Sequence, residues 1–141
     1  MSAYAEFVTE FRDQEALTVA LCTVAMPHGL PRLTRDEVEI HPDGTNLVGY
    51  DTTEARLAHL VVRKRHLGHT LSDIGFRKEA NGCFSVIVDD YDMNKGYGEP
   101  WLNAVKQQYA RALVTRKAHA LGYKIKERQE ADGSLSMVLA R

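Results

Sequence analysis

Hydrophobic and polar positions alternate in the first residues of the chain and then change to a helical period. Tyr4 to Phe11 mixes aromatic and β-branched residues with polar ones, which predicts a strand. After Asp13, a suitable cap for a helix N-terminus, apolar residues recur on one helical stripe. The stripe consists of Leu17, Ala20, Leu21 and Val24. We therefore expect a helix that ends at the Pro- and Gly-rich segment 27–31.

Three later stretches have the pattern of β-hairpins. Residues 35–51 form two short strand-like runs around Pro42-Asp43-Gly44. Asn81-Gly82 is a stronger signal, because both residues tolerate the positive φ of a type I′ turn. Residues 123–141 repeat the pattern around Asp132-Gly133. Before this last hairpin, a long helical pattern begins at Pro100 and ends near Gly122.

The order of these elements predicts the fold class. About eight strands and two helices indicate a single α+β domain over 1–141, with an antiparallel sheet that carries both helices on one face. The stretch KEANGCFSVIV also aligns with QEADGSLSMVL. Residues 4–50 and 83–140 are therefore candidate copies of a duplicated β-α-β-β unit. The alternative is that hairpin turns resemble one another through turn chemistry alone.

Composition narrows the class of protein. The chain has 141 residues, of which 44% are hydrophobic and 26% charged, as expected of a domain with a real core. Its net charge of -1 gives no global attraction to nucleic acid or to anionic membranes. Cys22 and Cys83 lack the spacing of a metal or disulfide motif, and no apolar stretch could span a bilayer. We expect a cytoplasmic protein without a membrane partner.

The Asp-rich stretch 89–94 is the first candidate site. Asp90, Asp92 and Asn94 match the start of a calcium loop, but Lys95 and Trp101 occupy positions that require Gly and Glu. If the preceding strand continues, Asp90 and Asp92 lie on one face and could hold Mg²⁺ together with water. The alternative is that Asp and Asn are common where strands end in turns. No other cofactor is expected.

Basic residues form the second candidate site. The chain has no acidic residue between Pro100 and Lys126. Such segregation could bind an anionic ligand, nucleic acid or an acidic protein, although a solvated helix face is the simpler explanation. The candidate residues are Arg63, Lys64, Arg65, Lys106, Arg111 and Lys117.

Arg116 is unusual because it falls inside the apolar stripe of the long helix. A charge there needs a partner or a route to water. We expect an ion pair with Asp90 or Asp92, which would give those aspartates a structural role. His66 and His69 have a chelating spacing but lack a third ligand nearby, so a polar loop is the better interpretation. The sequence contains no recognised catalytic motif.

Several segments, taken in order, resemble one known family. They are TEFRDQEALTVAL, VGYD, SDIGFRKEANGCFSVIVDD, WLNAVKQQYA and QEADGSLSMVL. Together they are similar to the uncharacterised Ycf-thirty-five-like family, conserved hypothetical proteins of plastids, cyanobacteria, other bacteria and phages. The segment AMPHGLPRLTRDEVEIHPDG does not match this family pattern. The resemblance implies relatives but no activity and no site residues.

The residues favour a binding function over catalysis. We expect a non-catalytic binding or adaptor protein that contacts another protein, through a sheet edge or the helix-bearing face, and that forms a homodimer. The first alternative is nucleotide or nucleic-acid binding through the basic residues. The second is a small divalent-metal enzyme that uses Asp90 and Asp92.

Overall fold

The computed structural model describes residues 3–50 and 55–140. Within these residues the chain forms seven strands and three helices around an antiparallel sheet. The strands are β1 (Tyr4–Val8), β2 (Glu39–Asn46), β3 (Leu57–Val62), β4 (Ile74–Lys78), β5 (Phe84–Asp89), β6 (Lys124–Gln129) and β7 (Leu135–Ala140). The helices are α1 (Gln14–Thr23), the single turn α2 (Asp90–Asp92) and α3 (Glu99–Ala120).

Five strands form one sheet in the order β1-β5-β4-β3-β2, and every neighbouring pair is antiparallel. The alternation of side chains along β5 explains its two faces. Phe84, Val86 and Val88 point into the main core with the residues of the helices. Ile87 points to the opposite face, where it forms a smaller apolar cluster. The helix-covered face therefore contains most of the hydrophobic core.

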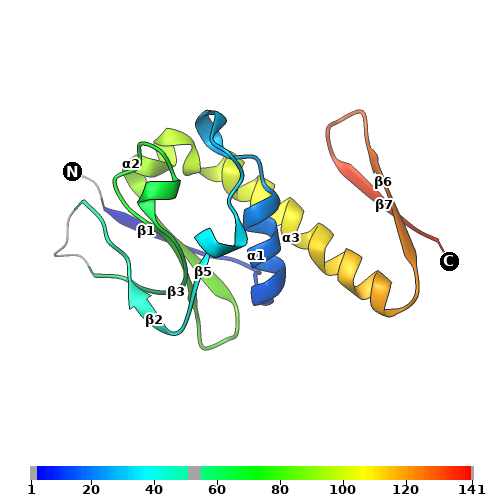
Figure 1. Ribbon diagram of the computed structural model, residues 1–141, viewed down its shortest axis with the longest axis horizontal. Helices are drawn as coiled ribbons and strands as arrows, with labels where there is room; N and C mark the ends of the chain where they lie inside the picture. The colour runs from blue at the N-terminus through cyan, green and yellow to red at the C-terminus, as the bar shows by residue number, and fades with distance from the viewer. Residues whose placement is uncertain (1–2, 51–54, 141) are drawn as a thin grey trace.

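The helices α1 and α3 lie side by side over this core (Figure 1). Asp13 caps α1 as expected, because its carboxylate accepts the backbone N–H of Ala16 at 2.8 Å. Tyr109 of α3 packs against Phe11 with ring centroids 4.8 Å apart. Its hydroxyl also accepts the backbone N–H of Arg12 at 2.9 Å. No helix among the described residues has the length and apolarity needed to cross a membrane.

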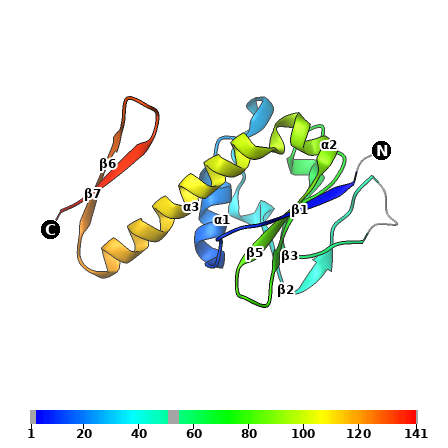
Figure 2. The ribbon, with the colours of Figure 1, turned by 180° about the vertical axis from the view of Figure 1, so that it is seen from behind.

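The strands β6 and β7 form a separate two-stranded sheet, which we call the terminal hairpin. Figures 1 and 2 both show that α3 leaves the body of the molecule and carries this hairpin at its far end. The chain turns back at Gly122, where a positive φ of 80° suits glycine. The terminal hairpin thus lies at the end of α3 and away from the large sheet.

The predicted α+β class with antiparallel sheet is confirmed, but the predicted eight strands with two packed helices are wrong. The error arises at Pro42-Asp43-Gly44, which does not turn the chain back. Ile40 pairs with Leu60 and Thr45 pairs with Ala58, so β2 continues past an irregular bulge in one direction. Its partner is β3, and the last residue of the predicted hairpin, Asp51, lies outside the described residues.

The two predicted copies do not fold alike. Residues 4–50 contain β1, α1 and β2, whose strands belong to the five-stranded sheet. Residues 83–140 contain β5, the helices α2 and α3, and the separate terminal hairpin. The hairpins predicted at Asn81-Gly82 and Asp132-Gly133 are both present. The feature that recurs is therefore the hairpin alone, as β4–β5 and as β6–β7, and β4–β5 lies outside residues 4–50.

Candidate functional site

The Asp-rich stretch anchors a neighbouring loop. The strand β5 ends at Asp89, and residues 90–92 form a helical turn, so Asp90 and Asp92 do not share a strand face as predicted. The fully buried Asp92 accepts the backbone N–H groups of Leu71 at 2.7 Å and Ser72 at 3.0 Å. Asp90 accepts the backbone N–H of Ala3 at 3.1 Å. Each carboxylate thus already has a structural partner.

Burial dominates the electrostatics of Asp92. Loss of hydration raises the pKa of its carboxyl above the ordinary value, while the two backbone hydrogen bonds partly oppose this shift. Within the described ranges, no group of three or more His, Cys, Asp or Glu residues is placed to hold a metal ion. His66 contacts Glu37 at 2.7 Å, in keeping with a polar loop. Magnesium binding by Asp90 and Asp92 stays a prediction.

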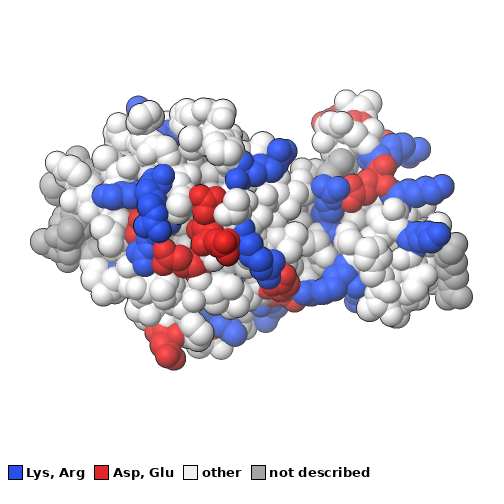
Figure 3. All heavy atoms as spheres, in the orientation of Figure 1, with Lys and Arg blue, Asp and Glu red and all other residues white. Residues whose placement is uncertain are grey.

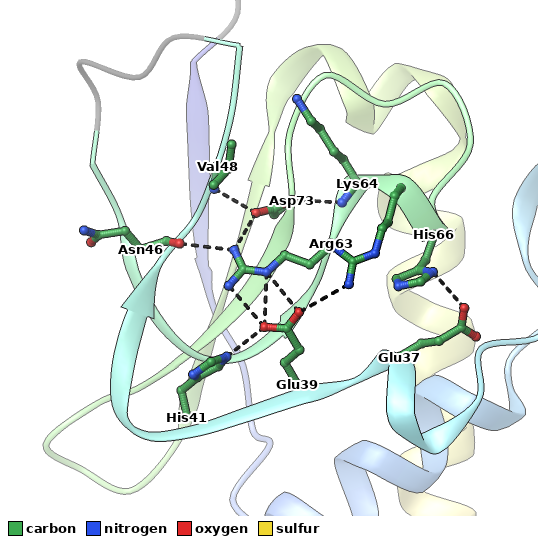
Figure 4. Close-up of polar contacts among 10 residues, drawn as sticks. Glu37, Glu39, His41, Asn46, Val48, Arg63, Lys64, His66 and Asp73 are labelled. Carbon is green, nitrogen blue, oxygen red and sulfur yellow. Dashed lines mark hydrogen bonds and ion pairs between the residues drawn. The ribbon is translucent and has the colours of Figure 1, made fainter.

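Arg63 occupies the centre of a polar network (Figure 4). Its partner Glu39 is paired with Val61 of the smaller apolar cluster, so the network lies on the sheet face opposite the helices. The guanidinium of Arg63 lies 2.9 Å from Asp73 and 3.1 Å from Glu39, and its side chain is only 17% exposed. The hydrogen bonds to Glu39 raise the pKa of Arg63, and the same bonds lower the pKa of Glu39. Two carboxylates therefore neutralise the first residue of the predicted anion-binding run.

Asp73 connects this network to the backbone of two other segments. Its carboxylate also accepts the backbone N–H groups of Val48 at 2.7 Å and Lys64 at 2.8 Å. The side chain of Lys64 points away from Arg63 and Asp73 (Figure 4). Arg65 is 70% exposed and approaches Glu39 only at 4.0 Å. In the predicted basic run, Lys64 and Arg65 thus remain accessible to an anion.

The structure does not unite the other basic candidates with this run. Arg111 of α3 forms an ion pair with Glu127 of β6. Lys106 lines a groove of about 780 Å³ between α3 and the segment after β1. Lys117 is exposed in the last turns of α3. The six predicted residues therefore do not form one continuous patch, and Figure 3 shows acidic and basic side chains interspersed on this face.

Arg116 pairs with Asp13 and not with Asp90 or Asp92, so the predicted partner is wrong. Its guanidinium donates to both carboxylate oxygens of Asp13. The reason is distance along α3. Asp92 precedes the start of the helix, whereas Arg116 lies seventeen residues beyond Glu99, about 25 Å along the axis. At that point α3 runs beside the N-terminus of α1, where Asp13 is located.

A basic stripe on the terminal hairpin was not predicted as a site. Lys124, Lys126 and Arg128 alternate along β6 and are all exposed, so they share one face of the hairpin. Arg128 contacts Glu130 at 3.3 Å. The alternation of basic residues in the sequence could have identified this stripe once the strand was assigned.

A groove lies between α1 and α3 with Glu127 of β6 at its border, and we call it the arm groove. Its volume is about 570 Å³. Val19 of α1, which is 37% exposed, and Ala112 of α3 supply apolar surface, whereas the lining residue Ala16 is only 2% exposed. Charged residues surround this surface, namely Glu15, Arg111, Arg116 and Glu127. Sequence reasoning missed the groove because it depends on how two helices distant in sequence pack together.

The charges around the arm groove are already paired with one another or with neighbours. Arg111 binds Glu127, Arg116 binds Asp13 and Glu15 binds Arg35. A groove with an apolar floor and neutralised rim suits the burial of apolar side chains.

Comparison with known proteins identifies the family. A family model described as a protein of unknown function (DUF1257) matches residues 33–138, which is more than half of the chain. Comparison with curated proteins found no match, and comparison with solved structures found none. The matched residues include β2 to β5, α3 and most of the terminal hairpin. The chain therefore belongs to the DUF1257 family of proteins of unknown function.

Proposed function

We propose that this chain is a non-catalytic binding protein that holds a segment of another protein in the arm groove. The observation that supports this proposal is the apolar floor formed by Val19 and Ala112, surrounded by charges that are already paired. Burial of apolar side chains is the main favourable contribution to protein association. Because the rim charges are already paired, the apolar floor is expected to supply most of the affinity.

A peptide segment fits this groove better than a small polar metabolite. Two of the residues that line the groove are alanines, which allow the backbone of a bound segment to approach α1 and α3 closely. Small-molecule sites instead need a few convergent and unpaired polar groups to fix the orientation of the ligand. Here the arginines that face the groove already bind Asp13 and Glu127.

Substitution of Val19 tests the groove directly. A partner protein is captured from an extract of the source organism, purified, and titrated against the wild-type chain and variants by calorimetry. We expect Val19→Arg to weaken binding at least about tenfold, because it places a charge on the apolar floor. Val48→Arg introduces the same side chain at another exposed valine, outside the groove, and should leave the affinity unchanged.

Two outcomes would contradict the proposal. One is equal binding by Val19→Arg and the wild-type chain, when thermal denaturation shows that both are folded. The other is weaker binding by Val48→Arg alone, which would move the partner to the face that carries Arg63.

The basic stripe favours nucleic-acid binding as a second candidate function. Lys124, Lys126 and Arg128 present three exposed cations on one face of the terminal hairpin. Phosphate contacts of this kind release counterions, so the affinity should fall steeply with salt. Fluorescence anisotropy with short oligonucleotides at two salt concentrations tests this function. Binding that is absent, or that is equal in a Lys124→Gln/Lys126→Gln variant, would count against it.

Within the DUF1257 family, we propose that the chain is a Ycf-thirty-five-like protein of the cytoplasm. The ordered segments that resemble that family support the first part. The two cysteines, Cys22 and Cys83, are free thiols, as expected in a reducing compartment. Cell fractionation followed by immunodetection tests the location, and recovery outside the cytoplasm would contradict it.

A further inference from the structure

The turn of the terminal hairpin has the same backbone hydrogen bonds as the turn of the β4–β5 hairpin. Glu79 N–H donates to the carbonyl of Cys83 at 2.8 Å, and Glu130 N–H donates to that of Ser134 at 2.8 Å. In both turns a glycine N–H returns a bond to the glutamate carbonyl at 3.0 Å. These glycines, Gly82 and Gly133, have φ values of 87° and 89°.

The side chains beside the two turns correspond as well. Arg77 donates to Glu79 at 3.0 Å, and Arg128 donates to Glu130 at 3.3 Å. The hydroxyl of Ser136 donates to Glu130, and at the equivalent position Ser85 lies close enough to Glu79 to lower the pKa of its carboxyl. The strand register is also the same, since Arg77 pairs with Ser85 and Arg128 pairs with Ser136. The terminal hairpin is therefore a second copy of a hairpin that the fold already uses.

The two copies differ in what lies beside them. In the large sheet, β4–β5 is flanked by β3 and β1, so both of its edges are hydrogen-bonded. Among the described residues, β6–β7 has no strand at either edge. A two-stranded hairpin is only marginally stable alone. Because the equivalent hairpin β4–β5 has a strand at each edge, the free edges of β6–β7 indicate a missing neighbouring strand.

The free edge of β7 lacks the features that prevent pairing. Edge strands are usually protected by charges, by proline or by bulges. The free edge of the large sheet at β2 contains Pro42, Asp43 and a bulge. The sequence of β7 contains no charged residue and no proline. Val138 and Leu139 in this strand are 52% and 49% exposed.

The register identifies the backbone groups at the free edge. Glu130 N–H bonds to Ser134, so the hydrogen-bonded pairs of this ladder include Lys126 with Val138. The intervening residues Met137 and Leu139 therefore direct their N–H and C=O groups away from β6. Met137 pairs with Glu127, which binds Arg111, so the side chains at these positions lie on the hairpin face that looks toward α3.

We infer that two copies of this chain associate by antiparallel pairing of β7 with β7, centred on Met137. The product is a four-stranded sheet in the order β6-β7-β7-β6. A two-fold axis through Met137 makes this edge self-complementary, because neutral residues meet neutral residues and each copy supplies the same donors and acceptors. The apolar side chains of Met137 and Leu139 from both copies then share the face that looks toward α3.

A second copy is favoured over a foreign strand by the absence of charge on β7. Recognition of a particular foreign strand would be expected to use charges at the edge. This pairing is independent of the arm groove, whose apolar floor comes from α1 and α3. It also leaves Lys124, Lys126 and Arg128 exposed, because these residues lie on the opposite face of β6.

Sedimentation equilibrium and residue-resolved amide exchange test the inference on the full chain. We expect a dimer in which the Met137 and Leu139 amides exchange at least about tenfold more slowly than the Glu6 and Val8 amides. Asp90 N–H bonds to the carbonyl of Ala3, so every second residue of β1 from Ala3 bonds to β5. The amides of Glu6 and Val8 lie between these residues and therefore point to the free edge of β1. A monomer, or a dimer with rapid exchange at Met137 and Leu139, overturns the inference.

A pair of variants at Leu139 isolates the backbone contribution. Leu139→Pro removes an outward N–H, whereas Leu139→Ala keeps it and shortens the side chain. We expect the proline variant to raise the dimer dissociation constant at least about tenfold more than the alanine variant. Protection of the Val138 amide, which bonds within the hairpin, shows that β6–β7 remains folded. Equal dissociation constants, or protection that includes Glu6 and Val8, would assign the interface elsewhere.

Discussion

Asp13 stabilises the junction between the two long helices through two interactions. Its carboxylate accepts the N–H of Ala16 at the start of α1 and also the guanidinium of Arg116 on α3. Arg63 is likewise held between Glu39 and Asp73. At the scale of single residues, these arginines therefore position structural elements and leave little charge for ligands.

Removal of the Asp13 carboxylate should destabilise the protein. We expect Asp13→Ala to lower the free energy of unfolding by about 1–2 kcal/mol, the usual effect of losing a helix cap. Asp13→Asn should cost less, because asparagine still caps the helix and loses only the ion pair. Urea denaturation measures both values. Equal stability of the alanine variant and the wild-type chain would contradict the assigned cap.

The stability contribution of Asp13 should depend on pH. Hydrogen bonding to Arg116 is the largest effect and lowers the pKa of Asp13 below 3.8, against a smaller rise from burial. A carboxyl group whose pKa is lower in the folded state stabilises that state at pH values above the pKa it has in the unfolded chain. This stabilisation is lost as the pH falls through the pKa of the folded state. The difference between the wild-type chain and Asp13→Asn should therefore be constant above about pH 5 and shrink at lower pH. A difference that grows on acidification would reverse the assigned sign.

The buried Asp92 should be important for stability. Asp92→Asn leaves only one side-chain oxygen for two backbone N–H donors, so we expect a loss of about 1–3 kcal/mol. Asp90→Asn, on an exposed residue, should change stability by less than about 0.5 kcal/mol. Chemical denaturation compares the two variants. The magnesium hypothesis requires in addition that Mg²⁺ raise the melting temperature of the wild-type chain but not of Asp92→Asn.

At the scale of elements, sequence patterns located most helices and strands but not all their partners. The cap at Asp13 and the turns at Asn81-Gly82 and Asp132-Gly133 follow from local chemistry, so they could be predicted. Pro42-Asp43-Gly44 has equally strong turn chemistry, yet pairing with β3 makes it a bulge inside β2. Local signals thus identify turns, whereas tertiary pairing decides whether a turn reverses the chain.

Gly75 illustrates a constraint that no local pattern shows. A Cβ atom at this position would lie 2.6 Å from the Ala58 Cβ and 2.7 Å from the Leu47 Cδ2. We expect Gly75→Ala to destabilise the protein by about 1–3 kcal/mol through overpacking. The double variant Gly75→Ala/Leu47→Ala should lose less than the sum of the single variants, because Leu47→Ala frees space. Additive losses in thermal or urea unfolding would contradict this contact.

The whole molecule consists of a helix-covered sheet and a terminal hairpin that α3 carries beyond it (Figures 1 and 2). The arm groove is lined by three segments that are distant in sequence, namely residues 15–23, residues 108–119 and Glu127. The core-facing stripe of α1 could be predicted from the sequence, but the groove residue Val19 lies off that stripe. The groove itself could not, because the packing of α1 beside α3 and the return of β6 along α3 depend on contacts distant in sequence.

The most direct test of the proposed binding function is hydrogen–deuterium exchange of the full chain with and without its captured partner. The account predicts that the partner slows exchange in residues 14–23 and 108–127, which border the arm groove. Residues 39–48 and 63–73, around the Arg63 network on the opposite face of the sheet, should be unaffected. Slower exchange confined to those two segments would contradict the account and place the binding surface on the uncovered face of the sheet.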